Sequence, residues 1–461
     1  PLAGYLLFVM LSTIFALEPG FSFWGSPYRG DGSLNSILYI LFAFFTYIII
    51  KKEDWKKIWA FAIMVGCLVS LIAVAQQFHL LSESVLVPYS DRPPSTLGNT
   101  NFLSAYLILL IFFSFSFGFK EKKLFRKALY IFASVLLLLG ITLTISRAGF
   151  LGIIIGFCWL LFFWGIKNRS INRLKNIIGL TLLFALIGIV VLTNTVGLSD
   201  KFDDNYVLKI FATRLTVKGL FDDGRFSSWR MVAPGLFDNS ILGTGPENFS
   251  VVFDRYFDPS LPKVVPIGGQ WWDRAHNFML EIALTTGIPS LLLYLFFWSV
   301  LFLFLQKQKN KNPDEYIIIH STQAVLISYL VVNFFGFDCP PTYIISFLIA
   351  GFSFSFISKN AEQEYVEEDS LAKSISFLNA KKAVLIGFGI FLLFFIWQYN
   401  VQPLKANAKI NWAKYYLEND DSCKRAYNTI SPHLNYGSYI NTYVKQTYVN
   451  ILTKCSAETN D

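Results

Sequence analysis

Long apolar blocks separated by short polar loops recur along almost the whole chain. Each block is continuous rather than alternating, and in lipid a continuous segment satisfies its own backbone groups only as a helix. Blocks of about 20 residues are also long enough to cross the hydrocarbon layer. The pattern therefore predicts an all-α polytopic membrane protein with about eleven transmembrane helices, at residues 2–17, 34–50, 57–78, 101–119, 128–146, 148–166, 174–196, 281–305, 316–335, 341–358 and 382–400.

This pattern divides the chain into four parts. Residues 1–197 hold the first seven predicted helices, 198–280 form one long polar loop, 281–400 hold four more helices, and 401–461 form a polar tail. The chain begins inside apolar sequence at Pro1, so we expect segments that precede it to be missing.

Basic residues gather in alternate short loops. By the positive-inside rule, the basic loops lie in the cytoplasm, so the long loop and the tail lie outside. The other short loops carry only Arg29, Arg92 and Arg147. The basic loops lie between the predicted helices and hold Lys51, Lys52, Lys56, Lys57, Lys120, Lys122, Lys123, Arg126, Lys127, Lys167, Arg169, Arg173, Lys175, Lys307, Lys309, Lys311, Lys359, Lys373, Lys381 and Lys382.

Composition agrees with a membrane protein. The chain is 54% hydrophobic and only 15% charged, and its mean hydropathy is +0.47. Its net charge of +8 would suit nucleic acid, but the basic residues mark membrane topology instead. Charged residues are rare within the predicted helices, which argues against an ion pump or ion-coupled transporter. We interpret His320 and Asn333 as hydrogen-bonding residues between helices.

The tail resembles a single tetratricopeptide unit, from Trp412-Ala-Lys-Tyr-Tyr to Ser431-Pro432. One such repeat does not bury its own faces, so we expect it to pack on the membrane domain or on further repeats. Cys423 and Cys455 flank this segment, and an external position permits them to form a disulfide.

Polar motifs recur where predicted helices begin on the outer side. A helix N-terminus presents free N–H groups and a partial positive charge, which favour an anion. Together the motifs predict a cationic site that suits a lipid-linked pyrophosphate. The simpler alternative is that the arginines reach to lipid headgroups while the asparagines only cap helices. The motifs are Arg92 with Asn99 and Asn101, Ser146-Arg147, and His276-Asn277.

The long loop adds Arg225 and Arg230. An arginine binds two phosphate oxygens with its planar fork, although a structural ion pair with Asp222, Asp223 or Glu247 is equally open. His276 is the loop's one histidine and is able to accept a proton from a hydroxyl near neutral pH. The acid pairs at 203–204 and 222–223 lack a convincing ligand spacing, so we predict no catalytic metal.

The motifs occur in an order that resembles the bacterial O-antigen ligase and polymerase superfamily, which also includes protein O-oligosaccharyltransferases. The resemblance covers roughly residues 90 to 300, and the asparagine motif here is Asn-Thr-Asn where many relatives have Asn-Pro-Asn. The series is Arg92…Gly98-Asn99-Thr100-Asn101, Ser146-Arg147-Ala148-Gly149, Arg225…Trp229, Leu242-Gly243-Thr244-Gly245…Phe249 and His276-Asn277…Leu280-Glu281…Gly287.

This resemblance implies a C-type glycosyltransferase bundle in the bacterial inner membrane, with its site on the periplasmic side. Such enzymes transfer a glycan from undecaprenyl pyrophosphate to an acceptor hydroxyl, usually with inversion and without a metal or other cofactor. Arg147 and Arg225 would then hold the pyrophosphate, and His276 would act as the base. Arg92, Asn99, Asn101, Arg230 and Asn277 would bind substrate.

The acceptor stays open at this level. We favour lipid A-core, as in an O-antigen ligase, over a growing glycan or a protein hydroxyl. A lipid-linked sugar transporter is an alternative of another class, but it predicts internal repeats and a polar path through the bundle. Neither is detectable in the sequence.

Overall fold

The computed structural model describes residues 1–26, 29–80, 92–163, 225–259, 272–308, 315–357, 397–418, 422–434 and 441–458, with single positions at 177, 181 and between 387 and 395. Every regular element in these ranges is a helix. The chain forms two compact units, residues 1–361 and 362–461.

Nine apolar helices build the first unit. Five of those described are long and apolar enough to cross a membrane, and four are shorter. The five are α4 (Trp55–Gln77), α5 (Thr100–Lys120), α6 (Leu124–Leu143), α16 (Ile288–Gln308) and α17 (Tyr316–Phe334). The four are α1 (Leu2–Ile14), α3 (Ser33–Ile49), α7 (Arg147–Phe163) and α18 (Pro340–Ile357).

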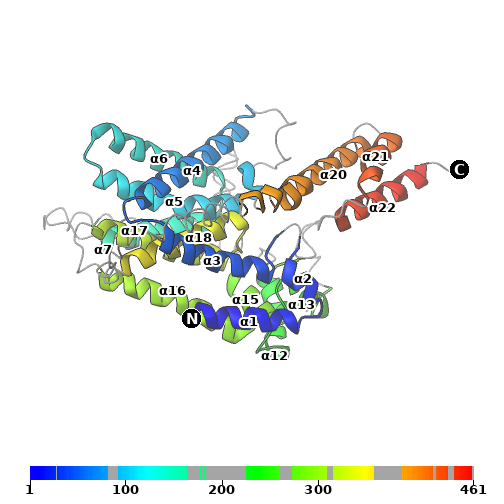
Figure 1. Ribbon diagram of the computed structural model, residues 1–461, viewed down its shortest axis with the longest axis horizontal. Helices are drawn as coiled ribbons and strands as arrows, with labels where there is room; N and C mark the ends of the chain where they lie inside the picture. The colour runs from blue at the N-terminus through cyan, green and yellow to red at the C-terminus, as the bar shows by residue number, and fades with distance from the viewer. Residues whose placement is uncertain are drawn as a thin grey trace, which may run out of the picture. The chain divides into compact units, whose positions relative to one another are not determined.

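Helices α5 and α17 form the centre of this unit. Their apolar windows are 83% and 78% buried, whereas those of α4, α6 and α16 are 28–33% buried. All five helices are apolar around most of their circumference. The peripheral helices therefore expose apolar side chains on their outer faces, as helices that contact lipid do. Figure 1 shows α5 and α17 with α4, α6, α7 and α18 around them.

Small residues let the central helices approach closely. Gly152 and Gly156 lie one turn apart on α7 and face α17. A Cβ atom at Gly152 would lie 2.7 Å from the Val332 side chain, and one at Gly156 would collide with the Ser328 hydroxyl. This small-xxx-small spacing is a common basis of helix contact in membranes, where packing replaces the hydrophobic effect.

The observed helices correspond to nine of the predicted spans. The segment 174–196 and most of 382–400 lie outside the described residues. One prediction was wrong in detail: 281–305 is not a single helix. Gly287, with φ of +93°, separates α15 (Phe278–Thr286) from α16. A short helix α2 (Pro19–Trp24) also follows α1.

The described part of the long loop holds three short helices, α11 (Arg225–Val232), α12 (Gly235–Asp238) and α13 (Phe249–Arg255). Helices α12 and α13 contact α15, beside which Figure 1 shows them, and α11 contacts α13. Phe249 and Phe253 are fully buried in a small core with Leu284. The Gly243-Thr244-Gly245 turn is joined to the end of α15, since the N–H groups of Thr244 and Gly245 donate to the carbonyls of Leu284 and Thr285.

Three of the described helices in the second unit form a hairpin with its own core. Helices α20 (Gln402–Glu418), α21 (Cys423–Ile430) and α22 (Asn441–Glu458) contact one another. Ile410, Ala426 and Val444 lie in the buried cluster between them. The three helices thus bury part of their faces against one another, although Trp412, Tyr415 and Val449 stay exposed. That the segment packs on the membrane domain or on further repeats stays a prediction.

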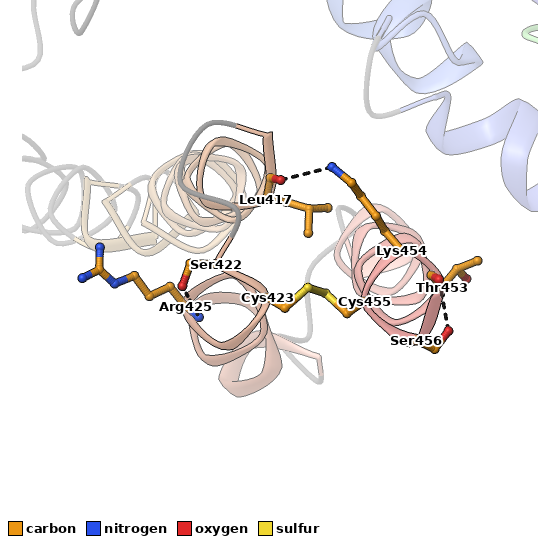
Figure 2. The surroundings of a disulfide bond; sticks show 8 residues. All are labelled: Leu417, Ser422, Cys423, Arg425, Thr453, Lys454, Cys455 and Ser456. Atoms are coloured by element: carbon orange, nitrogen blue, oxygen red, sulfur yellow. Dashed lines mark hydrogen bonds between the residues drawn. A yellow bond between two sulfur atoms is a disulfide. The ribbon is translucent and has the colours of Figure 1, made fainter. Parts of the chain in front are cut away.

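A disulfide joins Cys423 to Cys455 and closes this hairpin. Figure 2 shows it between α21 and α22, with Lys454 reaching across to the Leu417 carbonyl. The pairing that the sequence permitted is present. It agrees with an oxidising environment for this segment.

Substitution of Gly287 tests the break between α15 and α16. A Cβ atom there would collide with the Ile241 carbonyl, and the residue has a positive φ. We expect Gly287→Ala to destabilise the protein by about 2 kcal/mol or more, measured by thermal unfolding in detergent. Gly98→Ala is the control, because Gly98 also has a positive φ (73°) but open space around it. Equal effects would contradict the packing explanation.

Loss of the disulfide should loosen the second unit selectively. The bond spans 32 residues, and a loop of that size stabilises by about 3–4 kcal/mol through the unfolded chain. Cys423→Ser with Cys455→Ser should speed amide exchange across 402–458 at least about tenfold. Cys67→Ser, at a free cysteine, should leave that exchange unchanged. Uniform exchange in all three proteins would argue against the bond.

Candidate functional site

A small polar pocket lies where four helix ends converge. Its volume is about 30 Å³, which holds roughly one water molecule or one hydroxyl group. Its polar side chains come from the start of α5, from the residue before the α15 cap, and from the end of α17. The lining residues are Asn99, Asn101, Phe102, Ala105, Ala148, His276, Val332, Asn333, Phe335, Gly336 and Phe337.

The asparagine motif joins α5 to α7 at this pocket. Asn99 caps α5, as its side-chain oxygen accepts from the Asn101 N–H at 2.8 Å. The Asn101 side-chain oxygen accepts from the Ser146 hydroxyl at 3.0 Å, and that hydroxyl in turn accepts from the Gly149 N–H at 3.2 Å. The Asn-Thr-Asn sequence thus supports both a helix cap and a link between helices.

His276 is held in an uncommon backbone conformation. Its φ is +52°, a left-handed value that costs a non-glycine residue energy and occurs mainly at functional sites. Its ring lies 5.1 Å from that of Trp272 and 5.0 Å from that of Phe337. Nδ1 lies 3.1 Å from the Arg274 carbonyl oxygen. A carbonyl only accepts, so Nδ1 carries the proton and Nε2 carries the lone pair.

The surroundings keep His276 neutral. Burial lowers its pKa to about 4, and the positive charge of Arg225 acts in the same direction. The Arg274 carbonyl and Asp273 raise the pKa, while Arg29 lowers it. At pH 7 the ring is therefore a proton acceptor at Nε2.

Arg225 begins α11 beside the pocket. Its Nη1 donates to the Phe335 carbonyl at 2.9 Å, and Phe335 lines the pocket. Glu247, one of the alternative partners predicted for Arg225, pairs with Arg274 at 2.7 Å, and the other two, Asp222 and Asp223, lie outside the described residues. Arg225 thus lies close enough to act electrostatically on His276.

The other predicted site residues, Arg92, Arg147, Arg230 and Asn277, do not line this pocket. Arg92 donates to the Thr144 carbonyl at 3.4 Å, and Arg147 is the first residue of α7, so both lie at the 144–147 turn. Arg230 is exposed on α11. Asn277 is buried and caps α15, accepting from the N–H groups of Met279 and Leu280 at 2.9 and 3.0 Å. The sequence predicts Asn277 both as this cap, which is present, and as a substrate-binding residue, which stays a prediction.

A buried charge cluster behind His276 was not anticipated from the sequence. The Arg274 side chain is 3% exposed and faces three carboxylates: Glu247 at 2.7 Å, Glu281 at 2.9 Å and Asp31 at 3.3 Å. Burial raises the pKa of Asp31 to about 8; Arg274 opposes the rise, while Glu247 and Glu281 add to it. One guanidinium does not balance three carboxylates in a buried site, which favours protonation of a carboxylate there.

A further buried carboxylate supports the pocket from the loop between α17 and α18. Asp338 accepts from Tyr329, Asn333 and Thr342 at 2.6, 2.9 and 2.8 Å. Burial raises its pKa to about 6, and these hydrogen bonds limit the rise. Asn333 lines the pocket, so Asp338 fixes the orientation of that side chain. The sequence prediction of Asn333 as a hydrogen-bonding residue is confirmed, but its partner is this aspartate.

Little in the sequence indicates that these four carboxylates are buried at the site. Glu281 belongs to the motif that begins at His276, and Asp338 precedes Pro340 at the start of a helix. Asp31 and Glu247 lie in loops far from one another along the chain, and nothing local marks either as buried. Among the described residues no group of three or more His, Cys, Asp or Glu is arranged to hold a metal ion. The acid pairs at 203–204 and 222–223 lie outside those residues.

The fold and this pocket define an all-helical membrane protein with a neutral histidine at converging helix ends. Residues 132–295 match the family model whose description is O-Antigen ligase. The match contains Arg147, Arg225 and His276, and it confirms the family resemblance found in the motifs. No curated protein matches the chain.

Removal of the Arg225 charge should raise the pKa of His276. A nearby cation disfavours imidazolium, so Arg225→Gln should shift the titration midpoint upward from about 4 towards the ordinary value of 6.5. Nitrogen-15 NMR of histidine-labelled protein measures this. Arg255→Gln, which removes the exposed partner of Asp238, should leave the midpoint unchanged. A downward shift, or none, in Arg225→Gln would contradict this electrostatic account.

Proposed function

We propose that this protein is a glycosyltransferase of the bacterial inner membrane. It transfers a glycan from undecaprenyl pyrophosphate to an acceptor hydroxyl on the periplasmic side, as an O-antigen ligase does with lipid A-core. The observation that carries the proposal is the pocket shared by His276, Asn99 and Asn101. It places a proton acceptor against the helix caps within a chain that resembles this family.

The size of the pocket suits the reacting hydroxyl. A volume of about 30 Å³ is too small for a sugar ring but accommodates one hydroxyl group. In the proposed reaction this hydroxyl donates its proton to Nε2 of His276 as its oxygen attacks the anomeric carbon. The bond from that carbon to the phosphate oxygen breaks, and the pyrophosphate leaves with the electron pair. Attack opposite the leaving group inverts the anomeric centre.

The cations around the pocket suit the leaving group. Negative charge grows on the pyrophosphate as the bond breaks, and preorganised cations stabilise that charge most in the transition state. Arg147 at the start of α7 and Arg225 at the start of α11 are the proposed contacts. Arg92 lies near the same turn as Arg147, and Arg230 is exposed on α11 to bind outlying parts of the donor.

Donor binding also resolves the low basicity of His276. A pKa of about 4 describes the ring without substrate, and it makes a weak base. A bound pyrophosphate would bring negative charge near the ring and neutralise Arg225, both of which raise the pKa. The base would then become strong only when the donor is in place. This would limit unproductive proton transfer.

The second unit suits an external position. The Cys423–Cys455 disulfide requires an oxidising compartment, which is the side that the loop charges predict for the tail. We propose that this unit contributes to acceptor choice, among lipid A-core, a growing glycan and a protein hydroxyl.

Transfer assays with purified protein test the proposal. With undecaprenyl-pyrophosphate glycan and each acceptor class in turn, His276→Ala should lower kcat by about 100-fold or more. Arg147→Gln and Arg225→Gln should lower kcat/KM. Arg255→Gln, at an exposed ion pair on α13, is the control for loss of a surface charge.

The outcomes separate the function classes. Labelling of lipid A-core by the unaltered protein supports a ligase, whereas labelling of glycan or of protein supports the corresponding relative. If no acceptor is labelled although the donor binds, the transferase proposal fails. Movement of the lipid-linked glycan across a vesicle membrane that persists in His276→Ala would favour a transporter.

A further inference from the structure

Both polar backbone groups of Ala275, which belong to successive peptide groups, form hydrogen bonds with side chains. Its N–H donates to Glu281 Oε2 at 2.7 Å, and its carbonyl accepts from the Trp229 indole N–H at 2.7 Å. Ala275 itself is fully buried. Two side chains from different helices, α15 and α11, thus replace the backbone partners that a helix or sheet would supply.

Ala275 lies directly before His276, whose backbone is left-handed. Such a conformation persists only where surrounding contacts hold it. The Nδ1 contact of His276 is to the carbonyl of Arg274, the residue on the other side of Ala275. The Arg274 carbonyl shares a peptide plane with the Ala275 N–H, so rotation of that plane would turn the carbonyl away from the ring. The Ala275 carbonyl shares the next plane with the His276 N–H, so its contact bears on the φ of His276. The contacts at Ala275 therefore bear on both the backbone and the tautomer of His276.

Glu281 and Trp229 are each held in place by further contacts. Glu281 is buried, and its other oxygen accepts from Arg274 at 2.9 Å. The Trp229 ring lies 5.8 and 6.4 Å from those of Phe334 and Phe335, beside the carbonyl that Arg225 contacts. Neither side chain is among the residues that line the pocket. Both are suited to act through His276 rather than on a substrate.

We propose that Glu281 and Trp229 are positioning residues that clamp Ala275 and so hold the His276 ring with Nδ1 protonated and Nε2 available as the proton acceptor. The clamp rests on the proposed function only for its consequence in glycan transfer. Its effect on the histidine ring is a separate physical claim. Arg225 and Trp229 lie on the same helix, α11, so this helix contacts both the Phe335 carbonyl and the residue before His276.

The test uses the full chain in lipid nanodiscs with nitrogen-15 histidine. The chain has four histidines, and a His276→Gln variant identifies the relevant signal. Glu281→Gln keeps the size of the side chain but leaves it one oxygen for two donors. Trp229→Phe keeps an aromatic ring and removes the indole N–H, so it covers the case in which Glu281→Gln fails to fold.

In the unaltered protein we expect Nδ1 to be protonated and Nε2 to be the acceptor at neutral pH. In both variants the population with protonated Nε2 should grow. Loss of the Arg274 carbonyl contact, which raises the pKa of His276, should also move the titration midpoint below its value of about 4. The charges that act on the ring, Arg225, Arg29 and Asp273, are unchanged in both. In transfer assays, kcat should fall about tenfold or more while KM changes little.

Glu247→Gln is the matched control. Glu247 faces the same guanidinium at 2.7 Å but makes its backbone hydrogen bond to Asp31 rather than to Ala275. This variant should leave the His276 tautomer unchanged, whereas a change equal to that in Glu281→Gln would assign the effect to Arg274 charge balance and overturn the clamp. Unchanged tautomers in both folded clamp variants would also overturn it. A changed tautomer with unaltered transfer would support the clamp and contradict the role of His276 in the proposed function.

Discussion

The buried Arg274 guanidinium connects the parts of the first unit that the site requires. Its partners come from the loop before α3, from the long loop and from α15, which lie far apart in the chain. A charge removed from solvent is very costly unless it is paired, so the segments that carry these carboxylates must meet at one point. The same cluster fixes the residue whose carbonyl faces His276. The ion pairs thereby hold the end of the long polar loop, which includes His276, in a fixed position beside the pocket.

The apolar helices provide the frame against which this wall is built. Helices α5, α7 and α17 pack closely through small residues such as Gly152 and Gly156. Their ends at Asn99, Ala148 and Asn333 then lie around one pocket. Close packing in the apolar layer and ion pairing in the polar layer act together, because neither alone would bring His276 to the helix caps.

The sequence by itself determined the helical class and the main polar motifs. Apolar length dictates helices in lipid whatever their neighbours are, so nine predicted spans have counterparts among the described helices. Capping is also local, and Asn99 and Asn277 occupy the predicted cap positions. Residue type and motif order also singled out Arg225 and His276 as candidate site residues, and His276 lines the pocket.

Only the tertiary structure decided how those groups work. The break at Gly287 depends on close approach by the Ile241 carbonyl, which no local pattern reveals. The tautomer and low pKa of His276 depend on burial and on Arg225, and the partners of Arg274 are separated by hundreds of residues. Periodicity and caps report on neighbours along the helix, whereas electrostatics and packing depend on neighbours in space. The histidine was therefore found from the sequence, and its environment was not.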